Sequence, residues 1–419
     1  MKSSVNIRKT ITEICRIIIG VTFIFSGLMK AIDPIGGALK MEDYFGAFSL
    51  SALKPLAVFI SINLSSVEFM MGLCILAAVY RRITTFCILV FMSFMTLLTF
   101  YLAIFNPVHD CGCFGDALII TNWQTFYKNV FVLLPASVMI FINNRLMYPI
   151  YSSKVQWFIT LFAYFFPTVF ACYNVYHEPI KDFRPYKISN NIPQLMSFPA
   201  DAPQDVYEYI YEKNGEKKSF TPETAPANDS TWTFAEAKLV KSGYVPPVTT
   251  FELYDKEGNN IAEEILSDEK GVFLLVSPKL EKANDKSIDE INNIYDYAVE
   301  NQLKFYCLTS SDEQNIRSWI NSTGAEYPFL MADDVTLKTM IRSNPGLVLL
   351  KSGTVLNKFH YNDLPSDGDI NNLLSDNYNP STEVRRKEKN AWILVILCFT
   401  LPLLLVWGYD KLRTKNKII

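Results

Sequence analysis

Six long apolar segments constrain this chain more than any other feature of its sequence. Each is long enough to cross a bilayer, which takes about 20 apolar residues in a helix. They occupy residues 13–32, 56–79, 83–105, 125–143, 155–175 and 390–409. Between the fifth and sixth lies a polar stretch, residues 177–388, that is long enough for a domain with its own core. The sequence therefore predicts an α-helical bundle in a lipid bilayer with one large domain outside it.

Basic residues near the ends of the spans predict the orientation of the chain. If every span crosses once, four basic clusters fall on one side: Lys2, Arg8 and Lys9; Arg81 and Arg82; Arg145 and Lys154; and Lys411, Arg413, Lys415 and Lys417. That side is expected to be the cytoplasm. Both termini are then cytoplasmic, and the large domain is periplasmic, on a multi-pass protein of the cytoplasmic (inner) membrane. The formal net charge of −3 argues against a nucleic-acid partner.

Two cysteines, Cys111 and Cys113, lie one residue apart in the loop between the third and fourth spans. This loop is predicted to face the oxidising side of the membrane, where disulfides persist. Gly112 allows strained backbone angles, and a disulfide across so small a ring departs from relaxed geometry, so it should be easy to reduce. That suits a catalytic pair. A static staple or two free thiols stay open as an alternative, as does a zinc site with His109, Asp110 and Asp116. The loop holds no second ligand cluster, so no metal is expected.

Charged residues near this loop or within the spans are candidates to support its chemistry. Glu68 lies about midway along the second span, where an ionised carboxylate is costly and usually has a partner or a function. Lys30 is a candidate partner near the outer end of the first span, but Glu68 lies about 18 Å inward from the start of the second span. Contact therefore requires a tilted or shortened helix; otherwise Lys30 extends to the interface and Glu68 stays protonated. His109 and Asp110 flank the thiols, and His109 could stabilise a thiolate, shuttle a proton or simply mark the interface.

The periodicity of the outer segment predicts a hairpin followed by an α/β domain. Residues 206–213 and 216–221 alternate around Asn214-Gly215, which is a hairpin signal. Beyond Tyr244, strands and helices alternate and end in a second hairpin, as is typical of an α/β sheet. Cys307 lies in one of these strands and is expected to be buried and inert. The predicted strands are 245–254, 272–277, 303–308, 327–331, 347–350 and 355–359, and the predicted helices are 287–301, 313–321 and 335–341.

The motifs of the first four spans resemble a known family. They are Phe25-Ser26-Gly27-Leu28-Met29-Lys30, Val67-Glu68-Phe69-Met70-Met71-Gly72 and Asp110-Cys111-Gly112-Cys113-Phe114-Gly115. Together they look like the DoxX/MauE family of membrane proteins over about residues 10–145. MauE proteins, named for methylamine utilisation, are implied to assist disulfide formation in a periplasmic dehydrogenase. The family is also similar in architecture to four-helix, quinone-coupled thiol oxidoreductases of the VKOR/DsbB type.

Residues 245–365 are similar to thioredoxin-like domains of the TlpA/ResA kind. The resemblance is carried by Pro246-Pro247-x-x-x-Phe251, by Asn344-Pro345 in the place of the cis-proline loop, and by the final hairpin. The Cys-x-x-Cys expected after the strand at 272–276 is replaced by Ser277-Pro278-Lys279-Leu280. No thiol–disulfide exchange is expected there. The outer domain is therefore predicted to bind or scaffold a partner.

The predicted fold class is a bundle of about six transmembrane helices with a DoxX/MauE-like four-helix core, plus an α/β thioredoxin-like extracytoplasmic domain. The predicted division is a membrane domain at 1–145, a fifth span at 146–176, a linker with a hairpin at 177–244, the thioredoxin-like domain at 245–365, a linker at 366–389, and a last span with a basic tail at 390–419.

Two function classes follow from these features. In the first, the protein supports extracytoplasmic thiol oxidation, with Cys111 and Cys113 taking electrons from a client protein and passing them to quinone. Tyr101, Phe114 and Trp123 are candidates for the quinone pocket, although an interfacial aromatic belt accounts for them equally well. The alternative is a non-enzymatic assembly factor or scaffold whose redox-inactive outer domain binds a partner. The missing Cys-x-x-Cys and the lack of a second thiol pair favour that alternative.

Overall fold

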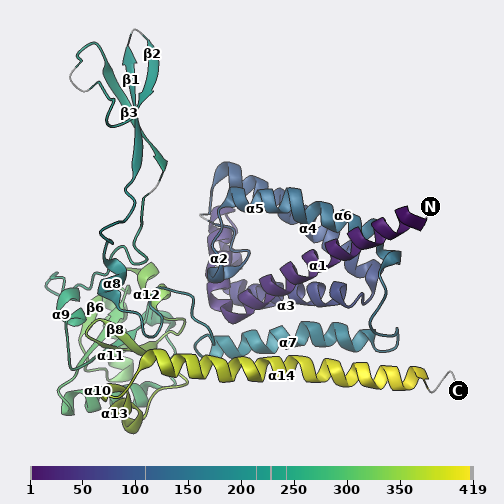
Figure 1. The fold of residues 1–419 in the computed structure, drawn as a ribbon. Helices are drawn as coiled ribbons and strands as arrows, with labels where there is room; N and C mark the ends of the chain where they lie inside the picture. Colours follow the sequence, from purple (N-terminus) through teal and green to yellow (C-terminus); the bar gives the residue numbers. More distant parts are fainter. Residues whose placement is uncertain (1, 109, 214, 227–228, 242, 416–419) are drawn as a thin grey trace.

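The structure is a computed structural model that describes residues 2–108, 110–213, 215–226, 229–241 and 243–415. Within these residues, six helices are long and apolar enough to cross a membrane. They are Asn6–Ile32, Ser51–Leu76, Arg81–Phe105, Asn122–Ile142, Gln156–Tyr176 and Pro380–Thr414. Figure 1 shows them as one elongated bundle, with an α/β domain at one end and both termini at the other. The prediction of about six membrane helices with an outer α/β domain is confirmed.

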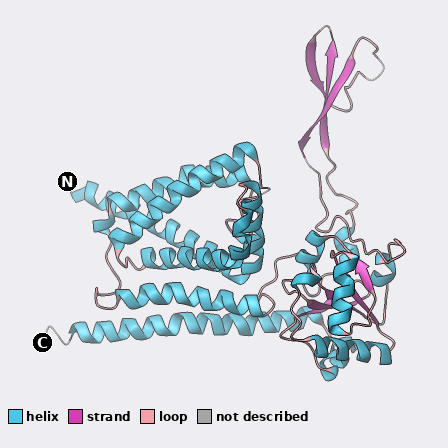
Figure 2. Cartoon of the chain, turned by 180° about the vertical axis from the view of Figure 1, so that it is seen from behind, coloured by secondary structure: helices cyan, strands magenta, loops and turns pink. Residues whose placement is uncertain are grey.

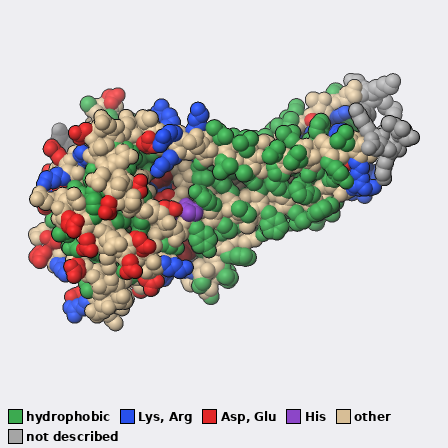
Figure 3. Space-filling view, turned by 90° about the horizontal axis from the view of Figure 1, so that it is seen from below, with side chains coloured by type: hydrophobic (Ala, Val, Ile, Leu, Met, Phe, Trp, Pro, Cys, Tyr) green, Lys and Arg blue, Asp and Glu red, His purple; other side chains and the backbone are tan. Residues whose placement is uncertain are grey.

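The first four spans form a bundle around their own core. It contains α1 (Lys2–Ile32), α3 (Ala57–Leu76), α4 (Arg81–Phe105) and a fourth span made of α5 (Asn122–Lys128), a π-helical turn (Asn129–Leu133) and α6 (Leu134–Ile142). Figure 3 shows hydrophobic side chains over the outside of the membrane helices, between the charged outer domain and a second group of charges at the far end. Such a surface fits contact with lipid, because the backbone polar groups are satisfied inside each helix.

Helices α1 and α3 approach each other closely because glycines face the contact. A Cβ atom at Gly27 would lie 2.6 Å from the Phe69 backbone nitrogen and from the Ser65 carbonyl oxygen. A Cβ atom at Gly72 would lie 2.7 Å from the Ile24 nitrogen. Small residues at such contacts let membrane helices pack by close backbone approach. The side chains of α1 are thereby brought within reach of those of α3.

The segment between the first two spans forms α2 (Pro34–Ala47) and a 3-10 turn (Ser51–Leu56), and the sequence analysis did not predict α2. The Asp33 carboxylate caps α2 by accepting a hydrogen bond from the Gly36 amide at 2.8 Å, and Pro34 occupies the first turn. α2 packs against α3 and crosses the end of the bundle that is nearer the outer domain (Figure 1). The bundle therefore has an extra helical layer at this end.

The last two spans, α7 (Gln156–Tyr176) and α14 (Pro380–Lys415), run side by side along the bundle (Figures 1 and 2). α7 packs against α3, and the rings of Phe69, Phe166 and Phe399 meet with centroids 5.1, 5.6 and 6.0 Å apart. α14 begins well before the span predicted at 390–409, inside the outer domain. Membrane helices therefore hold the outer domain at both ends of its chain.

The outer domain is built on a five-stranded sheet in the order β6-β5-β4-β7-β8. β4 (Val272–Val276), β5 (Lys304–Thr309) and β6 (Phe329–Met331) are parallel, whereas β7 (Gly346–Lys351) and β8 (Thr354–His360) are antiparallel. Apolar cores lie on both faces, and the main helices are α10 (Ile288–Glu300), α11 (Glu313–Thr323), α12 (Asp334–Met340) and α13 (Asp367–Leu374). A cis peptide bond joins Asn344 to Pro345 before β7. This arrangement is a thioredoxin-like fold, as predicted.

One predicted strand of this domain does not form. At 245–254 the structure has only isolated bridges, from Tyr254 to Asn260 and to Met331. Pro246 and Pro247 have no amide hydrogen, so the start of this segment cannot build a regular ladder. Its apolar side chains still enter the core, which two short helices also cover, α8 (Ile192–Met196) and α9 (Ala262–Leu266).

A second, three-stranded antiparallel sheet in the order β2-β1-β3 projects from the outer domain. β1 (Val206–Lys213) and β2 (Glu216–Phe220) form the predicted hairpin, and β3 (Thr233–Lys241) adds a strand that the sequence analysis did not predict. Figure 2 shows this sheet standing away from both the bundle and the five-stranded sheet. Aromatic rings contact one another on it: Tyr209, Tyr211, Phe220, Trp232 and Phe234.

The contact of α1 with α3 gives a test of the bundle. Gly27→Ala is expected to lower the midpoint of thermal unfolding in detergent, because the added methyl group meets backbone atoms of α3. Overpacking of this kind costs about 1–3 kcal/mol. Gly46→Ala on α2, where a Cβ atom meets nothing within 4 Å, is the matched control and should leave the midpoint unchanged or raised. A Gly27→Ala protein as stable as the wild type would show that the two helices do not make this contact.

Candidate functional site

The two cysteines of the Cys-Gly-Cys loop lie side by side at the end of the four-span bundle that is nearer the outer domain, between α4 and α5. Gly112 has a φ of +63°, a left-handed conformation that favours glycine. The Cys113 amide donates a hydrogen bond to Cys111 Sγ at 3.3 Å, and the two thiols also share a hydrogen bond. Cys111 is buried, Cys113 is half-buried, and both are free. The loop conformation thus brings the two thiols into direct contact.

Helix α2 holds this loop from the side. Lys40 Nζ lies 2.6 Å from Asp110 Oδ2, and the Tyr44 hydroxyl donates to the Cys111 carbonyl oxygen at 3.0 Å. Asp110 Oδ1 also accepts from the Gly112 amide at 2.9 Å, so Asp110 orients the backbone between the thiols. The other flanking candidate, His109, lies outside the described residues.

The surroundings of the loop shift the pKa values of the two thiols in opposite directions. A hydrogen bond from the Cys113 thiol, aided by the Cys113 amide and the Lys128 ammonium group, lowers the pKa of Cys111 to about 6, although burial opposes this. The same pairing, together with burial, raises the pKa of Cys113. Lys128 lies over the Phe114 ring, with Nζ 4.3 Å from the ring centroid. At neutral pH, Cys111 is therefore the thiolate of the pair and Cys113 the thiol.

An ion pair between Lys30 and Glu68 lies beneath the loop. Lys30 Nζ is 2.6 Å from Glu68 Oε1, and the two side chains are 10% and 4% exposed. Ser26 Oγ lies 2.7 Å from Glu68 Oε2 and 2.6 Å from the Cys113 carbonyl oxygen, so polar contacts run without a break from Lys30 to the loop. The contact that required a tilted or shortened helix does form, because Gly27, near the end of α1, packs against Ser65 and Phe69, about halfway along α3.

An apolar cavity of about 280 Å³ adjoins both cysteines. Its lining comes mainly from α2, α4 and the Cys-Gly-Cys loop, and its polar groups include Lys30 and Tyr44. The apolar side chains that line it include Phe45, Phe48, Leu64, Phe91, Phe94 and Leu98. Phe48 and Phe94 are exposed on the outside of the helices, so the cavity borders the lipid. A mostly apolar cavity with a few polar groups is typical of a small-molecule site. These residues fit a flat apolar ring such as that of a quinone.

The three aromatic residues predicted for such a pocket lie in different places. Phe114 is buried and lines a smaller cavity together with Cys113 and Lys30. Tyr101 is exposed and its ring contacts Phe48, at 5.5 Å between centroids. Trp123 is exposed on α5 and contacts neighbouring rings of the same helix. The structure therefore brings Phe114 to the thiols, whereas Tyr101 and Trp123 lie on the outer surface.

Sequence reasoning missed the α2 residues that border the site, although a signal was present. Met41, Tyr44, Phe45 and Phe48 all line the larger cavity. Their spacing of three, four and seven residues from Met41 places them on one helical face. This periodicity extends over only two turns, between charged neighbours, and it was too short to stand out beside the long apolar spans.

In the outer domain, Ser277 occupies the position expected for the first cysteine of a Cys-x-x-Cys. Ser277 Oγ donates to Asn344 Oδ1 at 2.7 Å, and Asn344 Nδ2 donates to the Lys279 carbonyl oxygen at 3.0 Å. The polar groups of this loop therefore satisfy one another. Cys307 is fully buried in β5, as predicted, and burial raises the pKa of its thiol.

Comparison with protein families agrees with this two-part architecture. Residues 8–142 match the family described as methylamine utilisation protein MauE. The match covers the four-helix bundle together with the Cys-Gly-Cys loop, so the predicted resemblance to MauE is confirmed. Residues 206–241, the projecting sheet, match a family described as a domain of unknown function (DUF8463). No curated protein matches the chain.

Solved structures similar to the chain include three thioredoxin-related proteins. The thioredoxin domain of a thiol-disulfide oxidoreductase from Bacteroides vulgatus is 12% identical, and the match covers 30% of this chain and 93% of that one, with a TM-score of 0.25. StoA from Bacillus subtilis is 13% identical, with 30% and 96% covered and a TM-score of 0.24. A thioredoxin-like protein from Aeropyrum pernix is 14% identical, with 30% and 88% covered and a TM-score of 0.22. At such low TM-scores, the fold assignment rests on the strand order described above.

The acidity of Cys111 can be measured directly. Because the thiolate is the nucleophile, the rate at which iodoacetamide alkylates Cys111 should rise as the pH passes about 6 and then level off. Mass spectrometry of the peptide that contains Cys111 gives this rate in the fully reduced protein. Cys307, whose pKa burial raises, serves as the internal reference and should react negligibly over the same range. A midpoint for Cys111 near the ordinary thiol value would show that the loop does not stabilise its thiolate.

Proposed function

We propose that this protein is a membrane thiol oxidoreductase in which Cys111 and Cys113 take two electrons from a client dithiol and pass them to quinone. The observation that most supports the proposal is a thiolate–thiol pair in direct contact beside an apolar cavity that borders the lipid. The match of residues 8–142 to MauE supports a membrane redox role in the same part of the chain.

The two thiols differ in a way that suits stepwise disulfide exchange. When Cys111 and Cys113 are joined in a disulfide, a client thiolate attacks Cys113, the less buried residue of the pair, and Cys111 leaves as the thiolate. The lower pKa of Cys111 makes it the better leaving group. A second client thiolate then attacks the client's own sulfur in the mixed disulfide. This step releases the oxidised client and the reduced Cys111/Cys113 pair.

Reoxidation of the pair must remove two electrons and two protons. A quinone in the cavity would accept the two electrons and the two protons and become a quinol. Phe45, Phe48 and Phe91 would hold its ring, and Lys30 and Tyr44 are the polar groups at its edge. The lipid side of the cavity, at Phe48 and Phe94, is where an apolar tail would leave. The chain would thus draw its oxidant from the bilayer.

The polar chain beneath the loop is suited to proton transfer. Ser26 Oγ is within hydrogen-bond distance of both Glu68 Oε2 and the Cys113 carbonyl oxygen, but its one proton can serve only one acceptor at a time. If Glu68 takes up a proton during turnover, it can donate to Ser26 while Ser26 donates to the Cys113 carbonyl oxygen, and the ion pair with Lys30 stabilises the carboxylate once that proton has left. Glu68 is therefore proposed to relay a proton between the loop and the cavity.

The proposed setting is the cytoplasmic membrane, with the Cys-Gly-Cys loop and the outer domain in the periplasm. Both termini lie at the end of the bundle opposite the outer domain (Figure 1). Charged side chains also gather at that end (Figure 3). A basic excess on one side is typical of the cytoplasmic side.

The reaction can be tested in lipid nanodiscs with a small dithiol and a soluble quinone, following quinone absorbance. Cys111→Ser and Cys113→Ser should each reduce quinone no faster than the uncatalysed reaction, because neither can form the disulfide. Cys307→Ser is the matched control and should keep the wild-type rate, since its thiol is fully buried in β5. If the wild type itself failed to couple the two substrates, or if both loop variants kept full function in cells, the scaffold role would replace the enzyme.

A second test concerns Glu68. Glu68→Gln should lower the rate of quinone reduction on the order of 100-fold, the usual contribution of a positioned proton-transfer group. The unpaired Lys30 charge would also destabilise the variant, so Lys30→Met/Glu68→Gln is made alongside it. The double variant should regain thermal stability without regaining activity. A Glu68→Gln protein with the wild-type rate would reduce Glu68 to a packing role.

A further inference from the structure

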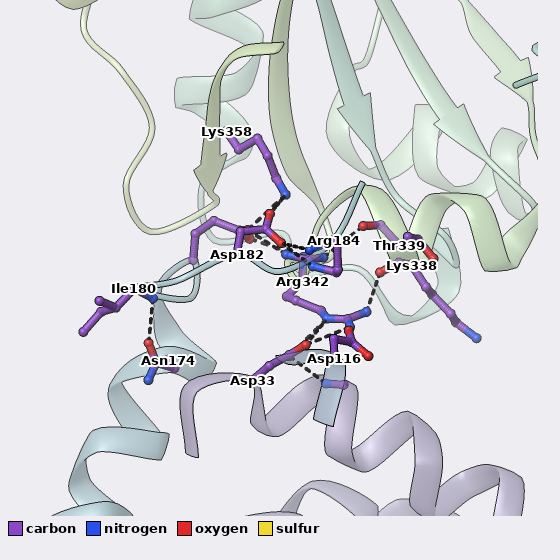
Figure 4. A network of polar contacts seen from close by, with 12 residues as sticks. Asp33, Asp116, Asn174, Ile180, Asp182, Arg184, Lys338, Thr339, Arg342 and Lys358 are labelled. Atoms are coloured by element: carbon purple, nitrogen blue, oxygen red, sulfur yellow. Dashed lines mark hydrogen bonds and ion pairs between the residues drawn. The ribbon is translucent and has the colours of Figure 1, made fainter. Parts of the chain in front are cut away.

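Arg342, which follows α12 in the outer domain, reaches across to two carboxylates of the MauE-like bundle (Figure 4). Its Nε and Nη2 atoms donate to the Asp33 carboxylate at 2.8–3.1 Å, and Nη2 also donates to Asp116 Oδ2 at 3.0 Å. The Arg342 side chain is 6% exposed. This contact joins two parts of the chain that are separated by more than 200 residues.

The two carboxylates place like charges next to each other, and their side chains are 11% (Asp33) and 33% (Asp116) exposed. Burial raises the pKa of Asp116, and the neighbouring Asp33 raises it further. Burial would also raise the pKa of Asp33, but Arg342 and Arg184, both from outside the bundle, together lower it. Lys40, a cation of the bundle that lies close enough to act on Asp116, is already paired with Asp110. The outer domain therefore supplies the charge that this pair of carboxylates needs.

Both carboxylates are directly connected to the elements that hold the thiols. Asp116 lies in the 3-10 turn (Gly115–Ala117) that follows Cys113 in the same loop, and Asp33 caps α2, the helix that carries Lys40 and Tyr44. Lys40 of α2 therefore holds the loop just before the thiols, at Asp110. Arg342, which also binds the α2 cap Asp33, holds the loop just after them, at Asp116. A Cβ atom at Gly36 would lie 2.8 Å from Arg342 Nη2, so the absence of a side chain there lets the guanidinium approach.

The outer domain holds Arg342 itself in place. Arg342 Nη1 donates to the Lys338 carbonyl oxygen at 2.7 Å, and its backbone amide donates to Glu178 Oε1 at 3.3 Å. Glu178 belongs to a buried ionic network that joins Asp182 and Arg184, in the segment after α7, to Lys358 on β8. Figure 4 shows this network directly above the contact with the bundle. The guanidinium is thus fixed before it meets the two carboxylates.

We propose that Arg342 is a positioning residue through which the redox-silent thioredoxin-like domain holds the Cys111-Gly112-Cys113 loop against α2. The outer domain then completes the redox site of the bundle, in addition to any client that it binds. The consequence for turnover rests on the proposed thiol oxidoreductase function. The proposal that Arg342 holds the loop does not rest on that function, because the alkylation rates of the two thiols test it without any turnover.

The full-length protein with Arg342→Met tests the proposal. In the reduced state at one fixed neutral pH, iodoacetamide should alkylate Cys113 and Cys111 faster than in the wild type, roughly tenfold or more, because breaking a buried ion pair strongly favours opening of the contact. The pH midpoint for Cys111 should rise as well, since the Cys113 hydrogen bonds are lost.

Lys304→Met is the matched control, because Lys304 also bridges two carboxylates, Glu264 and Asp268, within the outer domain alone. Its alkylation rates should equal those of the wild type.

Two further variants keep the test decisive if Arg342→Met does not fold. Arg342→Lys keeps the charge but lacks the planar fork that reaches both carboxylates, so alkylation should be intermediate. Arg342→Met/Asp33→Asn/Asp116→Asn removes the repulsion and should fold, yet its loop thiols should still react faster than those of the wild type. Wild-type alkylation rates in these variants would overturn the proposal. A wild-type protein that fails to reduce quinone would overturn the proposed function alone, provided that the variants still show faster alkylation.

Discussion

The buried ion pair between Lys30 and Glu68 is the interaction on which the rest of the membrane site depends. Charges at this depth are costly unless they are paired and hydrogen-bonded, so the helices must bring both groups together. They do so because Gly27 and Gly72 let α1 and α3 approach to backbone distance. The pair then places Ser26 beneath the Cys113 carbonyl oxygen. Helix packing, charge compensation and loop position are thus parts of one arrangement.

A second requirement comes from the layer of structure above the bundle. α2 covers the end of α1, lines the cavity and holds the thiol loop through Lys40 and Tyr44. Its own first turn begins at Asp33, whose carboxylate is neutralised by Arg342 from the outer domain. The thioredoxin-like domain lacks a thiol pair, yet it contacts the part of the bundle that contains one. A fold usually associated with redox chemistry here lies next to the Cys-Gly-Cys loop of the bundle.

Sequence-based predictions succeeded where the hydrophobic pattern was long and strong, and they failed where the pattern was short or the residues were exposed. Six long apolar segments predicted six membrane helices, because a bilayer requires about 20 apolar residues whatever the neighbouring structure. Alternating strands and helices predicted the thioredoxin-like sheet, since burial on two faces gives near-continuous apolar strands such as Val272–Val276. The strand predicted at 245–254 failed because two prolines remove the amide hydrogens that a ladder needs. α2 and β3 were missed because one is short and amphipathic, and the other consists entirely of exposed residues.

The sequence by itself determined which segments cross the membrane, where the two neighbouring thiols lie, and that the outer domain has no Cys-x-x-Cys. These properties depend on composition and on residues adjacent in the chain. Only the tertiary structure decided which charge neutralises which: Lys30 with Glu68, Lys40 with Asp110, and Arg342 with Asp33 and Asp116. Such partners lie tens to hundreds of residues apart, and no local periodicity encodes them. They are selected when packing removes water, because each buried charge must then find a counter-charge within a few ångströms.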